Sequence, residues 1–210
     1  MISQQAQAKR SYGGKRALDL VLLAIGAVPA AAVSLLCAVA VRASGPGPIL
    51  FRQVRIGRDG KPFVALKFRT MTDGPNPLFP DESRITRVGR VLRRTSLDEV
   101  PQLLNVLLGE MSLVGPRPAL PYQAERYDAR QRGRLAVRPG ITGLAQVNGR
   151  NSLTWADRIE WDLVYVQRQS LRLDLAIIAR TVAVVVLGTG MHGHPTDDPI
   201  STVPDVDQTR

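Results

Sequence analysis

Cysteine, histidine, lysine and aromatic residues are all scarce in this chain of 210 residues. Its single cysteine, Cys37, excludes a framework of internal disulfides. The two histidines, His192 and His194, lie near the C-terminus, and no cluster of Cys and His has the spacing of a zinc site. Aromatic residues make up 5% of the chain and no nucleic-acid-binding motif is recognisable, so we expect no nucleic-acid partner.

Basic residues, by contrast, are abundant, and almost all of them are arginine. The chain holds 24 Arg and 4 Lys against 18 acidic residues, which leaves a net charge of +10. Such a surplus predicts an anionic partner, either a phosphate-bearing substrate or an anionic membrane surface. Arginine suits bidentate phosphate contacts better than lysine, although a GC-rich genome would produce the same ratio without any function.

A long apolar run follows the N-terminus, where the segment Leu20–Val41 contains no formal charge. As a straight helix its 22 residues would extend about 33 Å, which matches the hydrocarbon core of a bilayer. A signal peptide is the competing interpretation, but the run is longer than the usual apolar region of one, and no clean cleavage site is evident. We therefore predict a membrane helix.

Charges on both sides of the run bear on its topology. Before the run lie Lys9, Arg10, Lys15 and Arg16, and after it lie Arg42, Arg52, Arg55 and Arg58. The positive-inside rule then draws both ends to the cytoplasmic face of the inner membrane. Pro29, near the middle, removes a helical hydrogen bond and predicts a bend. We predict a basic segment over residues 1–16 and a re-entrant membrane helix over 17–42, broken at Pro29; a kinked full span is the alternative.

The composition after the run is that of a soluble domain, which we place at residues 43–190 on the cytoplasmic side. Two strand-like segments, 48–55 and 62–69, flank a turn with Asp59-Gly60 and predict a β-hairpin. Residues 73–84 are too rich in Pro and Gly for regular structure, and they form either a lid or an inert surface loop. Together with the helices, the hairpin predicts a small mixed domain of the α+β class.

Two further helices are expected in the C-terminal half. Residues 154–169 are amphipathic, and their apolar stripe either faces the core or lies in the membrane interface with Trp161 and Tyr165 at headgroup level. Residues 173–187 are strongly apolar but contain two charges, which favours an interfacial or core helix over a second span. The acidic tail over 191–210 is rich in Pro and Asp, and we expect it to be disordered.

Two adjacent acids stand out between the hairpin and these helices. Apolar residues at helical spacing predict a helix that ends at Gly109 and has Asp98 and Glu99 at its N-terminus. Both acids have structural explanations, because Ser96 and Glu99 match a capping box and Asp98 would cap a helix with Pro101 in its first turn. The functional alternative is that adjacent carboxylates among arginines hold a divalent cation and attack phosphorus.

Three strings of residues carry a resemblance to a known family. They are SLDEVPQLLNVLLGEMSLVGPRP (96–118), KFRTM (67–71) and RPGITGLAQVNGR (138–150). With the basic N-terminus and the Pro-broken apolar run, their order and spacing resemble the bacterial sugar transferases, which are monotopic polyprenyl-phosphate phosphoglycosyl transferases. The resemblance covers roughly residues 14–190, and the chain looks like the minimal catalytic form of the family.

The resemblance implies an activity and a set of site residues. It implies that Asp98 is a nucleophile that also binds Mg²⁺, the implied cofactor, and that Glu99 is its partner in a catalytic dyad. Residues implied around the phosphates are Lys67, Arg93, Arg117 and Arg150. The implied reaction transfers a phospho-sugar from a UDP-sugar to a polyprenyl phosphate, releases UMP and starts a membrane-linked glycan such as an exopolysaccharide.

Other expectations concern partners and the competing class of function. We expect membrane lipid to contact the protein, and a homo-oligomer is left open. A non-catalytic membrane-associated assembly protein is the alternative, and in that class Asp98 and Glu99 would serve only as a helix cap.

Overall fold

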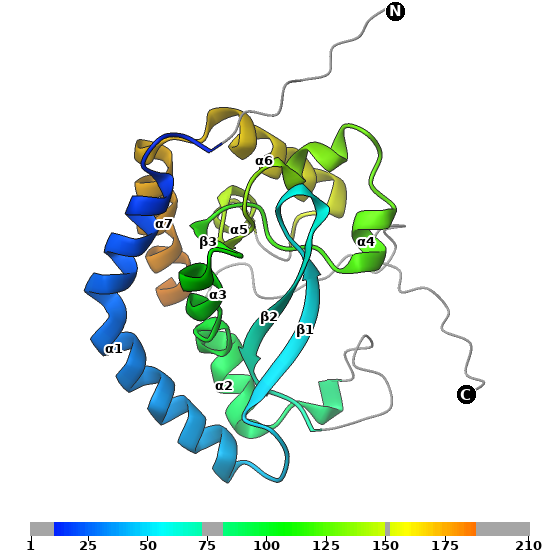
Figure 1. Cartoon of the computed structure of the whole chain (residues 1–210). Helices are drawn as coiled ribbons and strands as arrows, with labels where there is room; N and C mark the ends of the chain where they lie inside the picture. Colours follow the sequence, from blue (N-terminus) through cyan, green and yellow to red (C-terminus); the bar gives the residue numbers. More distant parts are fainter. Residues whose placement is uncertain (1–10, 73–81, 150–151, 188–210) are drawn as a thin grey trace, which may run out of the picture.

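The computed structural model describes residues 11–72, 82–149 and 152–187, and Figure 1 shows their arrangement. It has a mixed α+β architecture, as predicted, with one long apolar helix at the N-terminal end and a small β-hairpin. Most of the Pro- and Gly-rich segment 73–84, Arg150 and the acidic tail lie outside the described residues.

The elements follow one another with short connections. The α-helices are α1 (Lys15–Ala43), α2 (Arg87–Thr95), α3 (Gln102–Leu108), α4 (Pro121–Glu125), α5 (Leu144–Val147), α6 (Trp155–Arg168) and α7 (Leu171–Leu187). The strands are β1 (Leu50–Ile56), β2 (Pro62–Phe68), β3 (Ser112–Val114) and β4 (Gly140–Thr142). Short 3₁₀ helices are η1 (Arg58–Gly60), η2 (Glu82–Arg84), η3 (Leu97–Glu99) and η4 (Gln131–Ala136).

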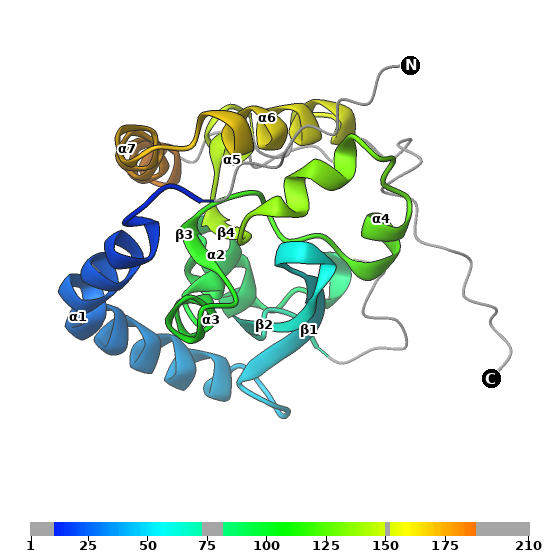
Figure 2. The same cartoon turned by 45° about the horizontal axis from the view of Figure 1, so that its top comes forward.

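Helix α1 continues through Pro29 as one uninterrupted helix. Its axis changes direction along the way, so that the helix forms an arc along one side of the molecule (Figures 1 and 2). The two predicted half-helices are therefore joined in one bent helix. Among the described residues, α1 is the one helix long and apolar enough to cross a membrane, and only 6% of its most apolar window is buried in the protein.

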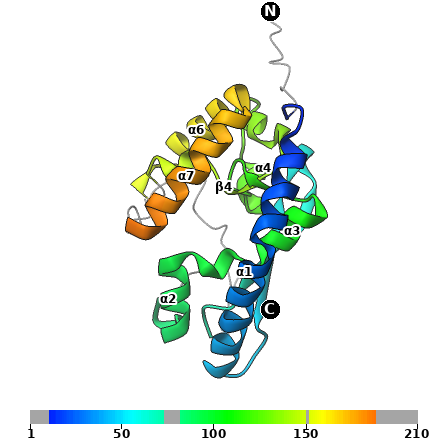
Figure 3. The same ribbon diagram turned by 90° about the vertical axis from the view of Figure 1, so that its left-hand side faces the viewer.

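Both ends of α1 pack against the same domain. At its N-terminal end the Lys15 ammonium lies 2.6 Å from the Asp174 carboxylate, and Arg16 donates to backbone carbonyls in the last turn of α3. At its C-terminal end Cys37 and Val41 are buried in a cluster with Phe68 and Leu92. Figure 3 shows α2 and α3 beside the helix. The charges of Lys15 and Arg16, expected to mark the membrane surface, are thus used within the fold.

The predicted hairpin is confirmed, because β1 and β2 pair antiparallel with Val54 opposite Val64. Asp59 and Gly60 turn the chain with positive φ angles of 59° and 75°. One face of the hairpin is exposed at its valine pair, while Phe63 and Ala65 on the other face pack into a core cluster with helix α3 and the residues that follow it. The hairpin thereby places Lys67, near the end of β2, beside the segment that carries the two acids.

Three glycines let two backbone segments approach closely. Strands β3 and β4 pair in parallel, and Gly115 follows β3 while Gly140 begins β4. A Cβ on Gly140 would lie 2.1 Å from the Gly115 nitrogen, and one on Gly143 would lie 2.2 Å from the Gly115 oxygen. No side chain fits in such contacts. The Gly-rich segment 139–143 therefore supports the loop that carries Arg117.

The two C-terminal helices form much of the main core. The apolar stripe of α6 is buried through Ile159, Leu163 and Val166, which confirms the core interpretation of that stripe. Tyr165 is also buried and donates to the Val114 carbonyl and to Asp174, so the expectation that it lies at headgroup level is wrong. Trp161 remains partly exposed. The headgroup expectation failed because the Tyr165 hydroxyl finds hydrogen-bond acceptors inside the protein, which makes burial of this polar ring favourable.

Candidate functional site

Asp98 and Glu99 lie on a single turn of 3₁₀ helix, η3, between α2 and α3. Ser96 ends α2 in the left-handed conformation, with φ 58°, and reverses the chain so that the turn can form. The Ser96 side chain makes no capping hydrogen bond to η3, and α3 begins after Pro101 without a side-chain cap. Both predicted caps are therefore wrong, and the two carboxylates are left for other contacts.

Glu99 is held by two cations. Lys67 Nζ and Arg117 Nη2 each lie 2.6 Å from Glu99 Oε1, while Arg117 Nη1 lies 3.4 Å from Oε2. Burial alone would raise the pKa of Glu99, but the charges and hydrogen bonds of Arg117 and Lys67 outweigh it and hold the pKa well below its usual range. Glu99 is therefore a permanent anion that fixes the positions of two cations.

Asp98 differs from its neighbour in having no such partners. Among the residues that the structure describes, none forms a hydrogen bond or ion pair with its half-buried carboxylate. Burial raises the pKa of Asp98 and the adjacent Glu99 adds to this, while the cations Lys67, Arg117 and Arg93 oppose it. The result is a carboxylate with unused oxygens beside a group of cations, which suits a nucleophile for an anionic substrate.

Arg93 reaches this group from the last turn of α2. Its Nε donates to the Thr70 hydroxyl at 2.9 Å, and its charge is close enough to lower the pKa of Asp98. Gly89 sets the position of the helix, because a Cβ there would lie 2.0 Å from the Thr70 carbonyl oxygen. Arg93 is an exposed residue, although its Nε bond to Thr70 is partly buried, so a phosphate can approach this side chain.

Arg117 projects from a Pro-Arg-Pro segment that follows β3. The Arg117 carbonyl accepts a hydrogen bond of 2.8 Å from Arg134, and the Pro118 carbonyl accepts one of 3.1 Å from Arg55. The ion pair with Glu99 raises the pKa of Arg117, whose charge is thus secure. The structure brings Lys67, Arg93 and Arg117 together around the two acids, while Arg150 lies outside the described residues.

Arg55 belongs to this group and was missed as a site residue, having been assigned only to membrane topology. Burial and the nearby charge of Arg117 lower its pKa to about 10, so it remains charged at neutral pH. The alternation of side chains along β1 is the sequence signal that could have identified Arg55 as a site residue. Phe51 pairs with Lys67, and residues two and four positions along the strand share its face, so strand alternation places Arg55 on the face of Lys67.

The donor set for Mg²⁺ is small. Glu99 is occupied by cations, so Asp98 is the acid whose oxygens are available. The described residues contain no group of three or more Asp, Glu, His or Cys side chains that could hold a metal ion. Magnesium is usually bound by one or two carboxylates together with substrate phosphates. Asp98 fits that mode of binding, in which a diphosphate supplies the remaining oxygens.

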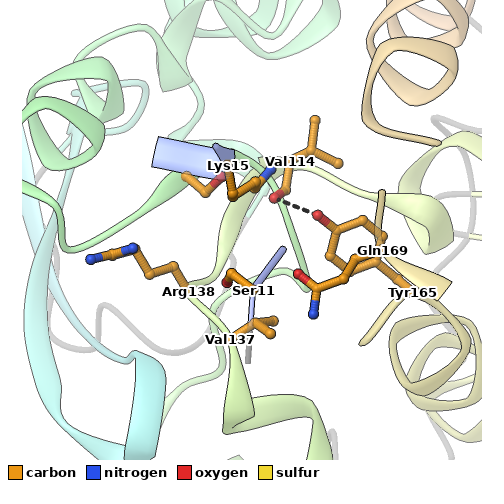
Figure 4. A pocket seen from close by; sticks show the side chains of 8 residues that line it. Ser11, Lys15, Val114, Val137, Arg138, Tyr165 and Gln169 are labelled. Carbon is orange, nitrogen blue, oxygen red and sulfur yellow. Dashed lines mark hydrogen bonds between the residues drawn. The ribbon is translucent and has the colours of Figure 1, made fainter. Parts of the chain in front are cut away.

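A separate small hollow lies at the N-terminal end of α1, away from the two acids. Figure 4 shows its lining, to which the start of α1, the β3 segment and the C-terminal end of α6 contribute. Lys15 and Tyr165 line it, and the dashed line marks the hydrogen bond from Tyr165 to the Val114 carbonyl. None of its lining residues is a predicted site residue, so we assign the site to the surroundings of Asp98.

Comparison with known proteins gives a consistent set of matches. A family model described as "Bacterial sugar transferase" matches residues 10–188. The uncharacterized sugar transferase EpsL of Bacillus subtilis is 47% identical over 173 residues, which cover 77% of this chain and 86% of that protein. The exopolysaccharide production protein ExoY of Sinorhizobium fredii is 39% identical, with 91% and 94% covered.

A third relative carries a name that states its reaction. The UDP-glucose:undecaprenyl-phosphate glucose-1-phosphate transferase of Caulobacter vibrioides is 48% identical over 181 residues, which cover 80% of this chain and 68% of that protein.

Proposed function

The chain belongs to the bacterial sugar transferase family, and on that premise we propose that it transfers a phospho-sugar from a UDP-sugar to a polyprenyl phosphate. It is an enzyme of the phosphoglycosyl transferase type. Support for the substrates comes from the relative whose name states transfer of glucose 1-phosphate to undecaprenyl phosphate. The product would begin a membrane-linked glycan.

The observation that carries the mechanism is that Glu99 is paired with two cations, whereas the Asp98 carboxylate has no partner among the described residues. In the first step an Asp98 oxygen attacks the sugar-linked phosphorus of the UDP-sugar. A bond forms from that oxygen to phosphorus, the bond to the bridging oxygen breaks, and UMP leaves with its electron pair. In the second step a phosphate oxygen of the polyprenyl phosphate attacks the same phosphorus and releases Asp98. The bond from the sugar to its oxygen is never broken, so the anomeric configuration is retained.

The cations around Asp98 stabilise the charge of the diphosphate. Phosphoryl transfer depends mainly on positioning and charge neutralisation, and the acceptor is already an anion that needs no strong base. Lys67 and Arg117 are oriented by Glu99, and Arg93 reaches the site from another helix. Arg150 is proposed as a further phosphate ligand from its motif. Mg²⁺, held by Asp98 and the substrate, would neutralise charge on the diphosphate.

The arrangement of α1 supports a re-entrant helix on the cytoplasmic face of the membrane. A helix that crossed the bilayer would separate its ends by the hydrocarbon thickness, but both ends of α1 contact one domain. Helix α3, which begins three residues after Glu99, exposes Leu104, Leu107 and Leu108. We propose that this apolar face also contacts lipid, which would bring the site to the interface where a polyprenyl phosphate resides.

UMP release tests the proposal. The purified chain is incubated with Mg²⁺ and a panel of UDP-sugars, with and without polyprenyl phosphate. With lipid we expect turnover, and without lipid we expect a single burst of about one UMP per active enzyme, because the intermediate cannot be discharged. Asp98→Asn should fold normally, since no hydrogen bond is lost, but should show no burst.

The matched control is Asp59→Asn, which makes the same change at an exposed hairpin turn. It should retain both burst and turnover. A folded Asp98→Asn protein with near-normal UMP release would reject the covalent mechanism. Wild-type protein that releases no UMP from any UDP-sugar would favour the non-catalytic assembly class, although neither acid acts as the helix cap which that class predicted.

A further inference from the structure

Arg134 is a charged residue that the mechanism above does not use, and it is almost completely buried. It lies in η4 at 3% exposure and forms an ion pair with Asp162 of α6, which is 1% exposed. Its guanidinium also donates to the hydroxyl of Tyr127 and, at 2.8 Å, to the backbone carbonyl of Arg117. A single buried side chain therefore connects α6 to the segment that carries a phosphate-binding residue.

The Pro-Arg-Pro segment has few backbone groups that can donate hydrogen bonds to its neighbours. Pro116 and Pro118 have no backbone N–H, so neighbouring groups must fix the segment mainly through its carbonyls. Two arginines do so at successive residues, Arg134 at the carbonyl of Arg117 and Arg55 at the carbonyl of Pro118. On the other side of the same residue, the Arg117 guanidinium contacts Glu99. The backbone that aims Arg117 is thus held by fixed guanidinium groups.

The pair of Arg134 and Asp162 is costly for a purely structural contact. Burial of two charges carries a desolvation cost that apolar residues of similar volume would avoid. The cost is only partly offset here, because Arg134 Nε and Asp162 Oδ1 are both buried without a hydrogen-bond partner in the described part of the chain. The same Arg134 Nη2 donates both to Asp162 and to the Arg117 carbonyl, so the ion pair also fixes the group that holds this carbonyl.

From these contacts we propose that Arg134 is a positioning residue, held by Asp162, that sets the orientation of Arg117 toward the substrate diphosphate. The inference rests on the proposed function, because it concerns the phosphate-binding role of Arg117. Arg134 itself is buried away from the reacting atoms and acts through the backbone of Arg117.

The first test compares Arg134→Lys and Asp162→Asn with wild type in the full-length chain. Lysine keeps the charge but lacks the rigid fork that reaches three acceptors, and asparagine keeps the size but releases Arg134. We expect kcat for UMP release to fall about 10- to 100-fold with a smaller change in KM, since small displacements of a positioned group carry losses of this order. Thermal unfolding identifies which of the two variants remain folded. A fall in kcat in either folded variant supports the proposal, and an unchanged kcat in a folded variant contradicts it.

The matched control is Arg130→Gln. Arg130 and Glu160 form an exposed ion pair between the start of the η4 segment and α6, the same two segments that Arg134 and Asp162 connect. That pair makes no contact with Arg117, so its loss should leave kcat and KM within about twofold of wild type, as for other exposed pairs. A loss of kcat in this variant equal to that of Arg134→Lys would show that any link between the η4 segment and α6 affects the rate, and it would overturn the proposal.

A double-mutant cycle separates positioning from general damage. In an Arg117→Gln background, the residual UMP release should be nearly unaffected by Arg134→Lys, because the residue being positioned has already been removed. An equal loss in the two backgrounds would overturn the proposal while leaving the proposed function intact. Wild-type protein without UMP release would reject the proposed function, and with it the role of Arg134.

Discussion

Asp98 and Glu99 are neighbours on one helical turn, yet the pKa of Asp98 is raised by burial whereas that of Glu99 is held well below its usual range by Arg117 and Lys67. The difference comes from the contacts, since burial acts in the same direction on the pKa of both side chains. Glu99 accepts hydrogen bonds from Lys67 and Arg117, whereas Asp98 accepts none from the described residues. Two chemically similar groups on one turn therefore have different roles. Glu99 holds the two cations in place, and the Asp98 carboxylate is available for reaction.

Glu99→Gln should impair the enzyme while leaving the Asp98 carboxylate in place. Glutamine is neutral, so Lys67 and Arg117 lose their fixed anion and their orientation toward the substrate. We expect turnover to fall about 100-fold, the order seen when a positioned electrostatic group is removed. Initial rates of UMP release measure this, and Glu125→Gln at an exposed position is the control. Near-normal turnover of a folded Glu99→Gln protein would contradict the anchoring role.

The lowered pKa of Glu99 also predicts how stability responds to acid. Glutamate in an unfolded chain titrates near 4.5, and the folded value is lower. The stabilisation from the ionised group is therefore complete above about pH 4.5 and is lost as the pH falls toward the folded pKa, because the unfolded chain takes up a proton first.

Thermal unfolding of wild type and Glu99→Gln across pH gives the measurement. The difference in Tm between the two proteins should be constant from pH 7 to about pH 5 and should shrink at lower pH. A difference that grows on acidification would have the opposite sign and would contradict the lowered pKa.

Gly140→Ala should destabilise the support of the Arg117 loop. The added Cβ would lie 2.1 Å from the Gly115 nitrogen and 2.3 Å from the Thr142 oxygen, and both are backbone atoms that cannot rotate away. Overpacking of this kind costs about 1–3 kcal/mol. Gly13→Ala, where nothing lies within 4 Å of the new atom, serves as the control. Denaturant unfolding measures both, and equal stabilities would show that the two loops can separate without cost.

Removal of divalent metal should abolish turnover. The diphosphate brings negative charge to a site that already contains Asp98, and neutralisation by Mg²⁺ would lower the barrier. We expect EDTA to stop UMP release and excess Mg²⁺ to restore it, whereas Ca²⁺, which is larger and less demanding in geometry, should restore little. Full turnover in chelator would exclude a metal requirement.

Single-cysteine labelling tests the re-entrant course of α1. Replacement of Cys37 by alanine gives a background without cysteine, since Cys37 is the one cysteine of the chain. Ser11→Cys and Ser44→Cys then mark positions on either side of α1. A membrane-impermeant reagent added outside intact cells should label neither, and after lysis it should label both. Labelling of one position alone from outside would indicate a full span instead.

Local patterns in the sequence predicted much of the fold. Alternation and the Asp59-Gly60 turn identified the hairpin, and helical spacing identified α6 and α7. The pairing of Asp98 and Glu99 at a helical turn was also expected. In each case the signal lies within a few residues of the chain, where backbone preference and apolar periodicity act.

Contacts between distant segments were beyond such reasoning. The capping interpretation failed because Lys67 and Arg117, from other elements, offer Glu99 better partners than local N–H groups do. Arg134 was not identified, because a buried arginine is evident only once its acceptors from three segments are assembled. Composition shows an excess of arginine but not which of them enter the interior.

The ion pair between Lys15 and Asp174 has a consequence for biosynthesis. Its two members are 159 residues apart in the sequence, so Lys15 leaves the ribosome long before its partner exists. If α1 inserts into the membrane as proposed, the charge of Lys15 would at that time still be free to retain the N-terminal end on the cytoplasmic side. Only after α7 has been synthesised can the same ammonium be buried, at 5% exposure, against Asp174. On that proposal, one side chain would first guide insertion and would later join the N-terminal end of α1 to α7.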